Sequence, residues 1–587
     1  MLKILKHLKP YWKWIIVVFI LLVIQANCDL ALPAYSSQII DTVIYNQGVK
    51  QIWEVGLKML TVTLIMAACT VAVGYCAAKV GAGIGRDLRK KTFETVVSYS
   101  NAEMDQFSTA SLITRSTNDI QQVQMVCTVF LRMLLYAPII GIGGVIKVAE
   151  TKAEMEWIIA LAVLLIMGFV MVLMSVTMPK FKIMQNLIDR LNLVAREILT
   201  GLSVIRAFSR EEREEQRFDE ANQNLTKTQL FTNRIMAIMM PGMSMIMYCV
   251  NLLIVWVAAH RIDDGTLQVG AMTAFITYTM LIVMSFLMLT VMSIMLPRAG
   301  VAASRIDEVL NTKSSILDSI KPIEKKEKQG VLEFKNVCFR YPNAKEDVLS
   351  DINFVAEPGK TTAIIGSTGC GKSTLVNLIP RFFDVTAGTI TLDGENIRDY
   401  ALKDLRENIG FVPQKGILFS GTIASNLRFG KEDASQEELI EAAQIAQALE
   451  FIEDKEEKYE SHIAQGGTNV SGGQKQRLAI ARAIIKKANI YVFDDSFSAL
   501  DMKTDVKLRK ALEETVKDAT VLIVAQRIST ILHADQILVL EDGRIVGKGT
   551  HEELLRNCEV YNQIARSQLS EKELGLDKSS IAEKEKN

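Results

Sequence analysis

The sequence has no excess of either charge, because 66 Lys and Arg residues balance 66 Asp and Glu residues in a chain of 587. This balance excludes a protein that binds nucleic acid through a dominant basic surface. Only five His are present, scattered and without an H-E-x-x-H pair, so we expect no metal site built from protein ligands alone. The eight Cys show no C-x-x-C spacing, which favours free thiols in a reducing compartment over disulfides.

The zero net charge is an average over two unlike halves. Residues 1–310 contain 28 basic and 23 acidic residues, whereas residues 311–587 contain 38 and 43. Hydrophobic residues make up 49% of the chain and the mean hydropathy is +0.20, which excludes a disordered chain. The apolar runs all lie before residue 310, so a purely soluble enzyme is excluded as well.

Six apolar runs in the first half are long enough to cross a membrane, which takes about 20 helical residues. Lys and Arg are concentrated at the N-terminus and in the second and fourth connections. The positive-inside rule therefore places both termini in the cytoplasm. We expect the membrane to be the cytoplasmic (inner) membrane. The predicted spans are Trp14–Ile40, Met59–Ala78, Met133–Val148, Trp157–Met178, Ile235–Ala259 and Ala271–Leu296.

Two connections between the spans are much longer than the others, Arg86–Arg132 and Pro179–Arg234. Both have helical patterning and no clusters of Gly and Pro. We expect helices that continue into the cytoplasm, not loops.

The second half alternates short β-branched runs with helices, which is typical of an α/β domain, after a polar linker at residues 311–330. One segment there matches G-x-x-x-x-G-K-[ST] between an apolar strand and a helix. Backbone N–H groups of such a loop wrap a β-phosphate, Lys372 reaches the β and γ oxygens, and the Ser373 hydroxyl can hold Mg²⁺. The segment is Gly366, Ser367, Thr368, Gly369, Cys370, Gly371, Lys372, Ser373 and Thr374.

Two further motifs point to nucleotide chemistry. The apolar strand Ile490–Asp494 ends in a carboxylate, the usual partner of the Mg²⁺ of a nucleotide, and Asp495 follows it directly. A Ser and two Gly open the predicted helix Lys475–Lys487, which forms a second phosphate-reading surface. This opening is Ser471, Gly472, Gly473 and Gln474.

Together these motifs resemble the ABC exporter half-transporters, in which six membrane helices are fused to one nucleotide-binding domain. The resemblance covers nearly the whole chain and implies ATP and Mg²⁺ as ligands. It implies that Tyr341 stacks on adenine, that Gln414 contacts Mg²⁺ together with Ser373 and Asp494, and that Asp501 belongs to the D-loop. It also implies a transmembrane domain at 1–310, a nucleotide-binding domain at 331–570 and a polar tail at 571–587.

The resemblance further implies a dimer. Two nucleotide-binding domains would meet head to tail, with each ATP between the phosphate loop of one chain and the signature motif Ser471–Gln474 of the other. Phe107–Arg115 and Ser203–Phe208 resemble the two intracellular loops of the family. Short coupling helices near Gln106–Ala110 and Phe218–Asn222 would transmit closure to the membrane helices.

Two positions depart from the family pattern. Glu normally follows the strand carboxylate and His normally occupies the switch position, whereas this chain has Asp495 and Gln526. A carboxylate one methylene shorter is set back by roughly 1.5 Å, and a misplaced base costs on the order of 10²-fold in rate. The Gln side chain neither takes up nor releases a proton at neutral pH, so it cannot replace a His that does. The chain thus resembles the degenerate-site subunit of bacterial heterodimeric exporters, paired with a second half-transporter; an active homodimer is the alternative.

The transported compound is less clearly marked. The four residues Met280, Met284, Met288 and Met292 recur every four positions along the sixth span, which suits either varied apolar substrates or plain contact with lipid and helices. Asp29 costs about 2.5–3.5 kcal/mol at a membrane centre and is a candidate for binding cationic substrates, or lies at the outer interface. We expect no basic residues in the cavity.

The leading prediction is ATP-driven export of small amphiphilic or drug-like compounds across the lipid bilayer, without a nucleic-acid partner. A lipid or lipopeptide flippase is the first alternative. A regulatory or sensor subunit that holds ATP without turnover is the second.

Overall fold

The computed structural model describes residues 4–44, 48–151, 154–323, 329–342 and 344–569. The chain forms two compact units, each treated by itself below. The first consists of Met1–Val96 and Ala110–Asn311, and the second of Val97–Thr109 and Thr312–Asn587. The predicted polar tail lies outside the described residues.

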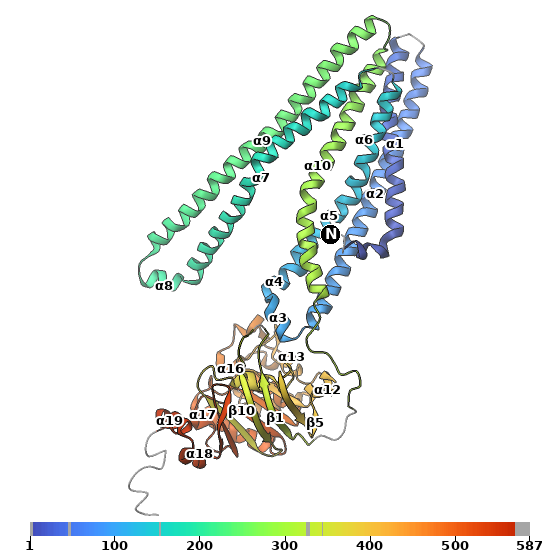
Figure 1. Cartoon of the computed structure of the whole chain (residues 1–587). Helices are drawn as coiled ribbons and strands as arrows, with labels where there is room; N and C mark the ends of the chain where they lie inside the picture. Colours follow the sequence, from blue (N-terminus) through green and yellow to red (C-terminus); the bar gives the residue numbers. More distant parts are fainter. Residues whose placement is uncertain (1–3, 45–47, 152–153, 324–328, 343, 570–587) are drawn as a thin grey trace, which may run out of the picture. The chain divides into compact units, whose positions relative to one another are not determined.

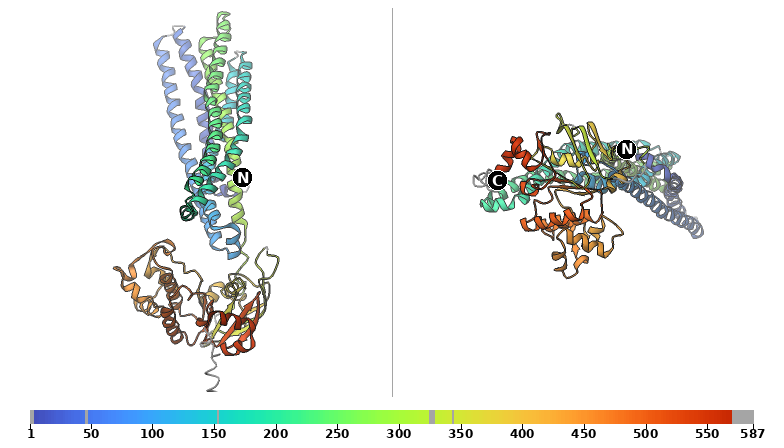
Figure 2. Two further views of the ribbon diagram at one scale, coloured as in Figure 1. Left: turned by 90° about the vertical axis from the view of Figure 1, so that its left-hand side faces the viewer. Right: turned by 90° about the horizontal axis from the view of Figure 1, so that it is seen from below.

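Among its described residues, the first unit contains helices and turns but no strand. Six of its helical stretches are long and apolar enough to cross a membrane, which confirms the number of spans predicted from the sequence. In Figure 1 the fourth and fifth of these stretches diverge from the others, and Figure 2 shows the stretches from two other sides. They are η1 (Ile4–Tyr11) with α1 (Trp12–Ile44), α2 (Val49–Val97), the composite third stretch, α7 (Glu156–Thr200), α9 (Glu211–Asp263) and α10 (Val269–Asn311).

The third stretch is one continuous helix with two π-helical turns. It comprises α4 (Thr109–Thr114), η2 (Arg115–Asp119), α5 (Ile120–Val129), η3 (Phe130–Leu134) and α6 (Leu135–Glu150). A π-helical turn inserts a residue into the helical ladder and often accompanies a functional position. The turn η3 is contiguous with the start of the third predicted span.

Helices α7 and α9 lie side by side, and the short helix α8 (Leu202–Ala207) joins their ends (Figure 1). The prediction of a coupling helix near Phe218–Asn222 is wrong, because these residues lie inside α9. The break occurs earlier, where Gly201 ends α7 and Ser209 has a φ of 50°. The acidic run that begins α9 favours a helix N-terminus there, since acidic side chains stabilise its positive end.

The segment Gln106–Ala110, predicted as the other coupling helix, does not form one helix either. Helix α3 runs from Asn101 to Phe107 and begins at Ser100, whose hydroxyl accepts a hydrogen bond from the N–H of Ala102. It ends before Ser108, which has a φ of 56°. The predicted segment Gln106–Ala110 therefore spans the break between α3 and α4.

The core of the first unit consists of apolar side chains from α1, α6, α7, α9 and α10, and of a second cluster from α1, α2, α5 and α10. Many large apolar side chains point outward. Leu64, Met171 and Leu252 are 63%, 67% and 70% exposed. Exposed apolar surface on this scale marks a partner or a membrane, and a bilayer is the environment that such long apolar helices require.

The second unit contains two larger sheets. An antiparallel sheet has the order β2 (Leu349–Ala356), β1 (Leu332–Phe339), β4 (Ala387–Leu392) and β5 (Glu395–Asn396). A six-stranded sheet has the order β12 (Arg544–Gly549), β11 (Gln536–Glu541), β3 (Thr361–Gly366), β10 (Thr520–Val524), β9 (Ile490–Asp494) and β6 (Ile409–Val412). Its strands are parallel except for the β11–β12 pair.

Helices surround these sheets, and those between β6 and β9 gather in a lobe beside them (orange in Figure 2). This confirms the predicted fold class, a six-helix membrane domain fused to an α/β domain. The helices are α11 (Lys372–Asn377), α12 (Leu402–Glu407), α13 (Ile423–Arg428), α14 (Gln436–Ile445), α15 (Leu449–Glu453), α16 (Gly472–Ile484), α17 (Met502–Thr515), α18 (His551–Asn557) and α19 (Glu559–Gln568); the short strands β7 (Gly421–Thr422) and β8 (His462–Ile463) pair with each other.

Helix α3 packs on the second unit although it lies between membrane helices in the sequence. The buried carboxylate of Glu103 accepts hydrogen bonds from the N–H of Ser100 at 2.9 Å and from the N–H of Ser315 at 3.1 Å. Ala102 contacts the core cluster of the antiparallel sheet. One carboxylate thus ties the start of α3 to the segment that follows α10.

Candidate nucleotide site

The predicted nucleotide residues lie at the carboxyl ends of neighbouring parallel strands. The phosphate loop follows β3, Gln526 follows β10, Asp494 ends β9 and Gln414 follows β6. The strand register places Val524 beside both Ile364 and Asp494. Ligands of open parallel sheets bind at such an edge, because the loops at the carboxyl ends converge there.

The phosphate loop depends on its glycines. Gly369 and Gly371 have φ values of 88° and 101°, a region that favours glycine. A Cβ atom on Gly366 would lie 2.1 Å from the carbonyl oxygen of Leu540 on the neighbouring strand. The Lys372 ammonium donates hydrogen bonds to the carbonyl oxygens of Gly366 at 2.8 Å and Ser367 at 2.7 Å, so the cation lies across the loop.

A hydroxyl and a carboxylate are paired where Mg²⁺ is expected. The Ser373 hydroxyl donates to Oδ1 of Asp494 at 2.9 Å, and Asp494 is buried. Burial raises the pKa of Asp494, and the hydrogen bond from Ser373 opposes this shift. Mg²⁺ prefers oxygen ligands, and a bound cation would favour the ionised carboxylate, so this donor set fits the ion.

Asp495 is held by two amide side chains. Nε2 of Gln526 donates to Oδ2 of Asp495 at 2.7 Å, and Nε2 of Gln414 approaches the same oxygen at 3.4 Å. Burial raises the pKa of Asp495, while the Gln414 contact and the nearby Ser498, Lys372 and Arg527 oppose the shift. The structure therefore joins both departures from the family pattern, Asp495 and Gln526, in one hydrogen bond.

Tyr341 lies at the side of the loop. Its hydroxyl is 3.0 Å from the hydroxyl of Thr374, and its ring meets those of Phe339 and Phe383 edge to face. These contacts fix the orientation of the ring, which is half-buried. Stacking of this ring on adenine remains a prediction.

The signature residues form a separate, exposed surface. Ser471 precedes α16 and forms a capping box with Gln474, in which Gln474 N–H donates to the Ser471 hydroxyl at 3.3 Å. Asp501 caps α17 in a similar way by accepting a hydrogen bond from the N–H of Thr504 at 2.9 Å. Among the described residues, no hydrogen bond joins Ser471–Gln474 to the phosphate loop.

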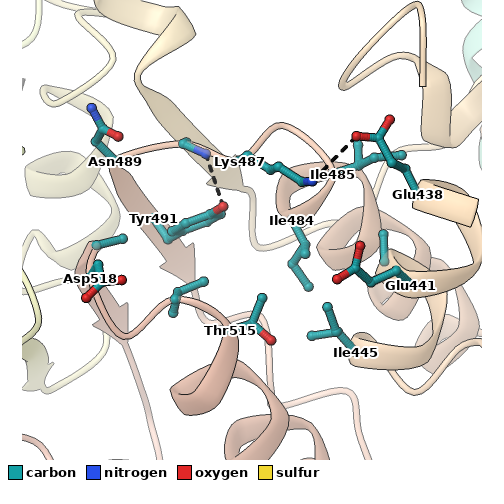
Figure 3. Close-up of a pocket in the computed structure, with 14 residues that line it drawn as sticks. Glu438, Glu441, Ile445, Ile484, Ile485, Lys487, Asn489, Tyr491, Thr515 and Asp518 are labelled. Carbon is teal, nitrogen blue, oxygen red and sulfur yellow. Dashed lines mark hydrogen bonds and ion pairs between the residues drawn. The ribbon is translucent and has the colours of Figure 1, made fainter. Parts of the chain in front are cut away.

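A cavity of about 360 Å³ between α14, α16, β9 and α17 is distinct from this site (Figure 3). Ile445 and Ile484 contribute apolar surface to it. The Lys487 ammonium lies 3.5 Å from the Glu438 carboxylate, and the hydroxyl of Tyr491 accepts a hydrogen bond from Ala488 N–H. The cavity shares no lining residue with the phosphate loop, so we assign it no part in nucleotide binding.

The substrate candidates in the membrane unit lie in different surroundings. Met280 and Met284 are 54% and 46% exposed, Met288 lines a cavity and Met292 is buried. Asp29 accepts a hydrogen bond from the hydroxyl of Tyr136. The four Met residues therefore do not share one environment.

The structure corrects the expectation that no basic residue lines a cavity of the membrane unit. Arg132, in η3, lines the cavity that also contains Met288. The sequence contained one signal, an Arg directly before the third predicted span. The sequence does not show which way the Arg132 side chain points, because the π-helical turn that contains it departs from regular α-helical spacing.

Comparison with known proteins agrees with this arrangement. Residues 15–286 match the ABC transporter transmembrane region, and residues 349–498 match the ABC transporter family. An uncharacterized ABC transporter ATP-binding protein of Mycobacterium tuberculosis is 40% identical over 567 residues, covering 96% of this chain and 97% of the relative. A candidate multidrug export ATP-binding/permease protein of Bacillus subtilis is 32% identical over 96% of this chain and 98% of its own. The ATP-dependent lipid A-core flippase of Pseudomonas aeruginosa is 34% identical, over 85% of this chain and 82% of the flippase.

Proposed function

Because this chain belongs to the ABC transporters, as an exporter half-transporter with its membrane region and ATPase domain in one polypeptide, we propose that it exports amphiphilic or drug-like compounds as one subunit of a heterodimer. Its own phosphate loop forms an ATP site that hydrolyses poorly. Its signature motif completes the competent site of the partner. Both termini face the cytoplasm in the cytoplasmic membrane.

The observation that carries the proposal is the hydrogen bond between Gln526 and Asp495. A general base must reach the attacking water, and the shorter Asp side chain is set back from the position of a Glu by roughly 1.5 Å. Here the carboxylate is also occupied by the amide of Gln526 at 2.7 Å. Gln526 supplies neither charge nor a proton, so both groups that face the γ-phosphate are weakened together.

The groups that bind ATP are in place. The phosphate loop directs backbone N–H groups at the phosphates, and Lys372 exchanges its two carbonyl partners for phosphate oxygens. Ser373 and Asp494, joined at 2.9 Å, would hold Mg²⁺, with Gln414 as the further ligand that the resemblance implies. The ion would supply positive charge to neutralise the phosphates. ATP is therefore retained between the two subunits while the competent site turns over.

The division of labour is tested by ATP turnover of the reconstituted pair. Asp495→Asn is expected to change turnover less than about threefold, because that site contributes little. Ser471→Arg is expected to abolish turnover, because it blocks the surface that completes the partner's site. Ser435→Arg is the matched control, since Ser435 also caps a helix through a capping box but lies outside the motif. Equal losses from Asp495→Asn and Ser471→Arg would contradict the proposal.

Purification of this chain alone gives an independent test. A homodimer of this chain would have two weakened sites, so we expect only trace ATPase activity. Robust turnover of the isolated chain would show that it works as a homodimer.

A lipid or lipopeptide flippase is the second candidate function, favoured by the similarity to a lipid A-core flippase. Deletion of the gene distinguishes the two. Loss of drug resistance supports drug export, whereas accumulation of lipid in the inner leaflet supports the flippase. A regulatory or sensor subunit would instead bind ATP and give no vectorial transport in vesicles.

A further inference from the structure

A cavity of about 220 Å³ lies within the membrane unit, between α1, α2, α10 and the stretch from α5 to α6. Its lining is mostly apolar. The polar side chains in it are Gln25, Thr70, Arg132 and Tyr136. The hydroxyl of Thr70 already donates to the carbonyl oxygen of Met66 at 2.8 Å.

Arg132 brings an unpaired charge to this cavity. Among the residues that the structure describes, its guanidinium makes no hydrogen bond and no ion pair. Arg132 is exposed and directly precedes the third predicted span, so its charge is tolerated without a protein partner while its side chain lines the cavity. Arg132 and Met133 in η3 and Tyr136 in α6 line the cavity together.

The carboxylate of Asp29 lies beside this lining, because it is hydrogen-bonded to Tyr136. Asp29 is not part of the cavity lining, and its Oδ2 accepts the hydrogen bond from Tyr136. The hydroxyl of Tyr136 therefore donates to Asp29, and Arg132 is the one charged residue among the described residues that line the cavity. A cationic substrate is disfavoured in such a site, whereas an anionic oxygen group would pair with the guanidinium.

The size of the cavity limits what enters it. About 220 Å³ is near seven times the roughly 30 Å³ of a water molecule, and below the ~300–1,000 Å³ of pockets that enclose drug-sized ligands. The space suits a head group and its first carbon atoms. A longer tail must leave the cavity along the neighbouring helices.

Helix α10 offers a surface for that tail. Met288 lines the cavity, and Met284 and Met280 follow on the same helix face, 46% and 54% exposed. Eight helical residues span about 12 Å, comparable to a medium-length acyl chain. Met side chains are flexible and polarisable, so they accommodate tails of varied shape.

We propose that this cavity is a head-group site for acidic amphiphiles, in which Arg132 binds a phosphate or carboxylate and Met288, Met284 and Met280 contact the tail. The proposal deepens the export function above by naming the class of compound. It rests on that function only for the statement that the bound amphiphile is transported. Binding itself requires no ATP hydrolysis.

The test is equilibrium binding of dodecyl phosphate to the full-length chain in phosphatidylcholine nanodiscs without nucleotide, with empty nanodiscs as the blank. Dodecyltrimethylammonium is the matched cationic probe. We expect the phosphate to bind at least about tenfold more tightly than the ammonium. Arg132→Gln should weaken phosphate binding by about 10- to 100-fold, since it removes a charge-assisted contact, and Arg132→Lys should retain most of it.

Arg234→Gln is the control. Arg234 also directly precedes a predicted span and is exposed, but it does not line the cavity. This variant should bind dodecyl phosphate as the unchanged protein does.

Each outcome decides the proposal. Equal binding of the two probes, or equal affinity of the Arg132→Gln variant, overturns it. If Arg132→Gln does not fold, the preference of the unchanged protein for phosphate over ammonium remains decisive. Phosphatidylglycerol nanodiscs distinguish the source of the head group, because dodecyl phosphate binding is lost there if a bilayer phospholipid occupies the site. The binding measurement uses no ATP. Its result therefore stands even if the proposed export function proves wrong.

Discussion

Replacing Glu103 by Gln tests how helix α3 is held on the nucleotide-binding unit. Glu103 is 6% exposed and accepts hydrogen bonds from the N–H of Ser100 at 2.9 Å, the hydroxyl of Ser100 at 2.6 Å and the N–H of Ser315 at 3.1 Å. Burial acts to raise the pKa of Glu103, but these hydrogen bonds outweigh it and hold the pKa below its ordinary value. The carboxylate is thus ionised at neutral pH, and its contribution to stability is lost only under acid conditions.

The magnitude follows from the number of acceptors. Gln has a single carbonyl oxygen, and its amide nitrogen donates, so it can satisfy Ser100 or Ser315 but not both. One N–H then loses its charged acceptor. A hydrogen bond to a charged group contributes about 1.5–3 kcal/mol, so the loss is about 2 kcal/mol, or about 30-fold in the population of undocked α3.

Hydrogen exchange of the full-length protein measures this population. We expect the amides of Asn101–Phe107 to exchange about 30-fold faster in Glu103→Gln. Asp105→Asn, on an exposed residue of the same helix, serves as the control and should change exchange less than about twofold. Unchanged exchange in Glu103→Gln, or equal effects of the two substitutions, would refute the reasoning.

Three further predictions concern the nucleotide-binding unit. Lys372→Ala should weaken binding of a fluorescent ATP analogue at least about tenfold, whereas Lys360→Ala, on a surface Lys paired with Glu357, should not. Gly366→Ala should lower the melting temperature, because its Cβ would lie 2.1 Å from the Leu540 carbonyl oxygen, and overpacking costs about 1–3 kcal/mol. Burial lowers the pKa of His551, which contacts the Tyr561 hydroxyl, so the unfolded chain takes up the proton first and stability falls as the pH drops below 6.5. The fall in melting temperature between neutral and acid pH should therefore be smaller in His551→Gln, and an equal fall would contradict this.

Most of the fold could be predicted because its signals are local. An apolar run of span length has few alternatives to a membrane helix. The segment from Gly366 to Thr374 contains the glycines that its loop conformation requires, so its sequence alone indicates the loop. Parallel strands then bring Gln414, Asp494 and Gln526 to one sheet edge, so the site follows from topology once the strands are recognised.

The remaining features depend on contacts between distant segments. The pairing of Glu103 with Ser315 joins residues that are 212 positions apart, and no periodicity predicts it. The separate helix that the resemblance implies near Phe218–Asn222 does not form, because α9 begins at Glu211 and continues through this segment without a break. The direction of Arg132 was hidden because the π-helical turn η3 shifts the helical register. The Met stripe was regular in sequence, yet packing buries Met292 and leaves Met280 exposed.

The most direct test of the central claim is the identity of the nucleotide that remains on this chain after turnover. The assembled transporter in its native membrane is supplied with photoreactive ATP labelled at the α-phosphate, crosslinked, and separated into its subunits. The account predicts intact ATP on this chain and ADP on the partner. ADP on both subunits in equal proportion would contradict it.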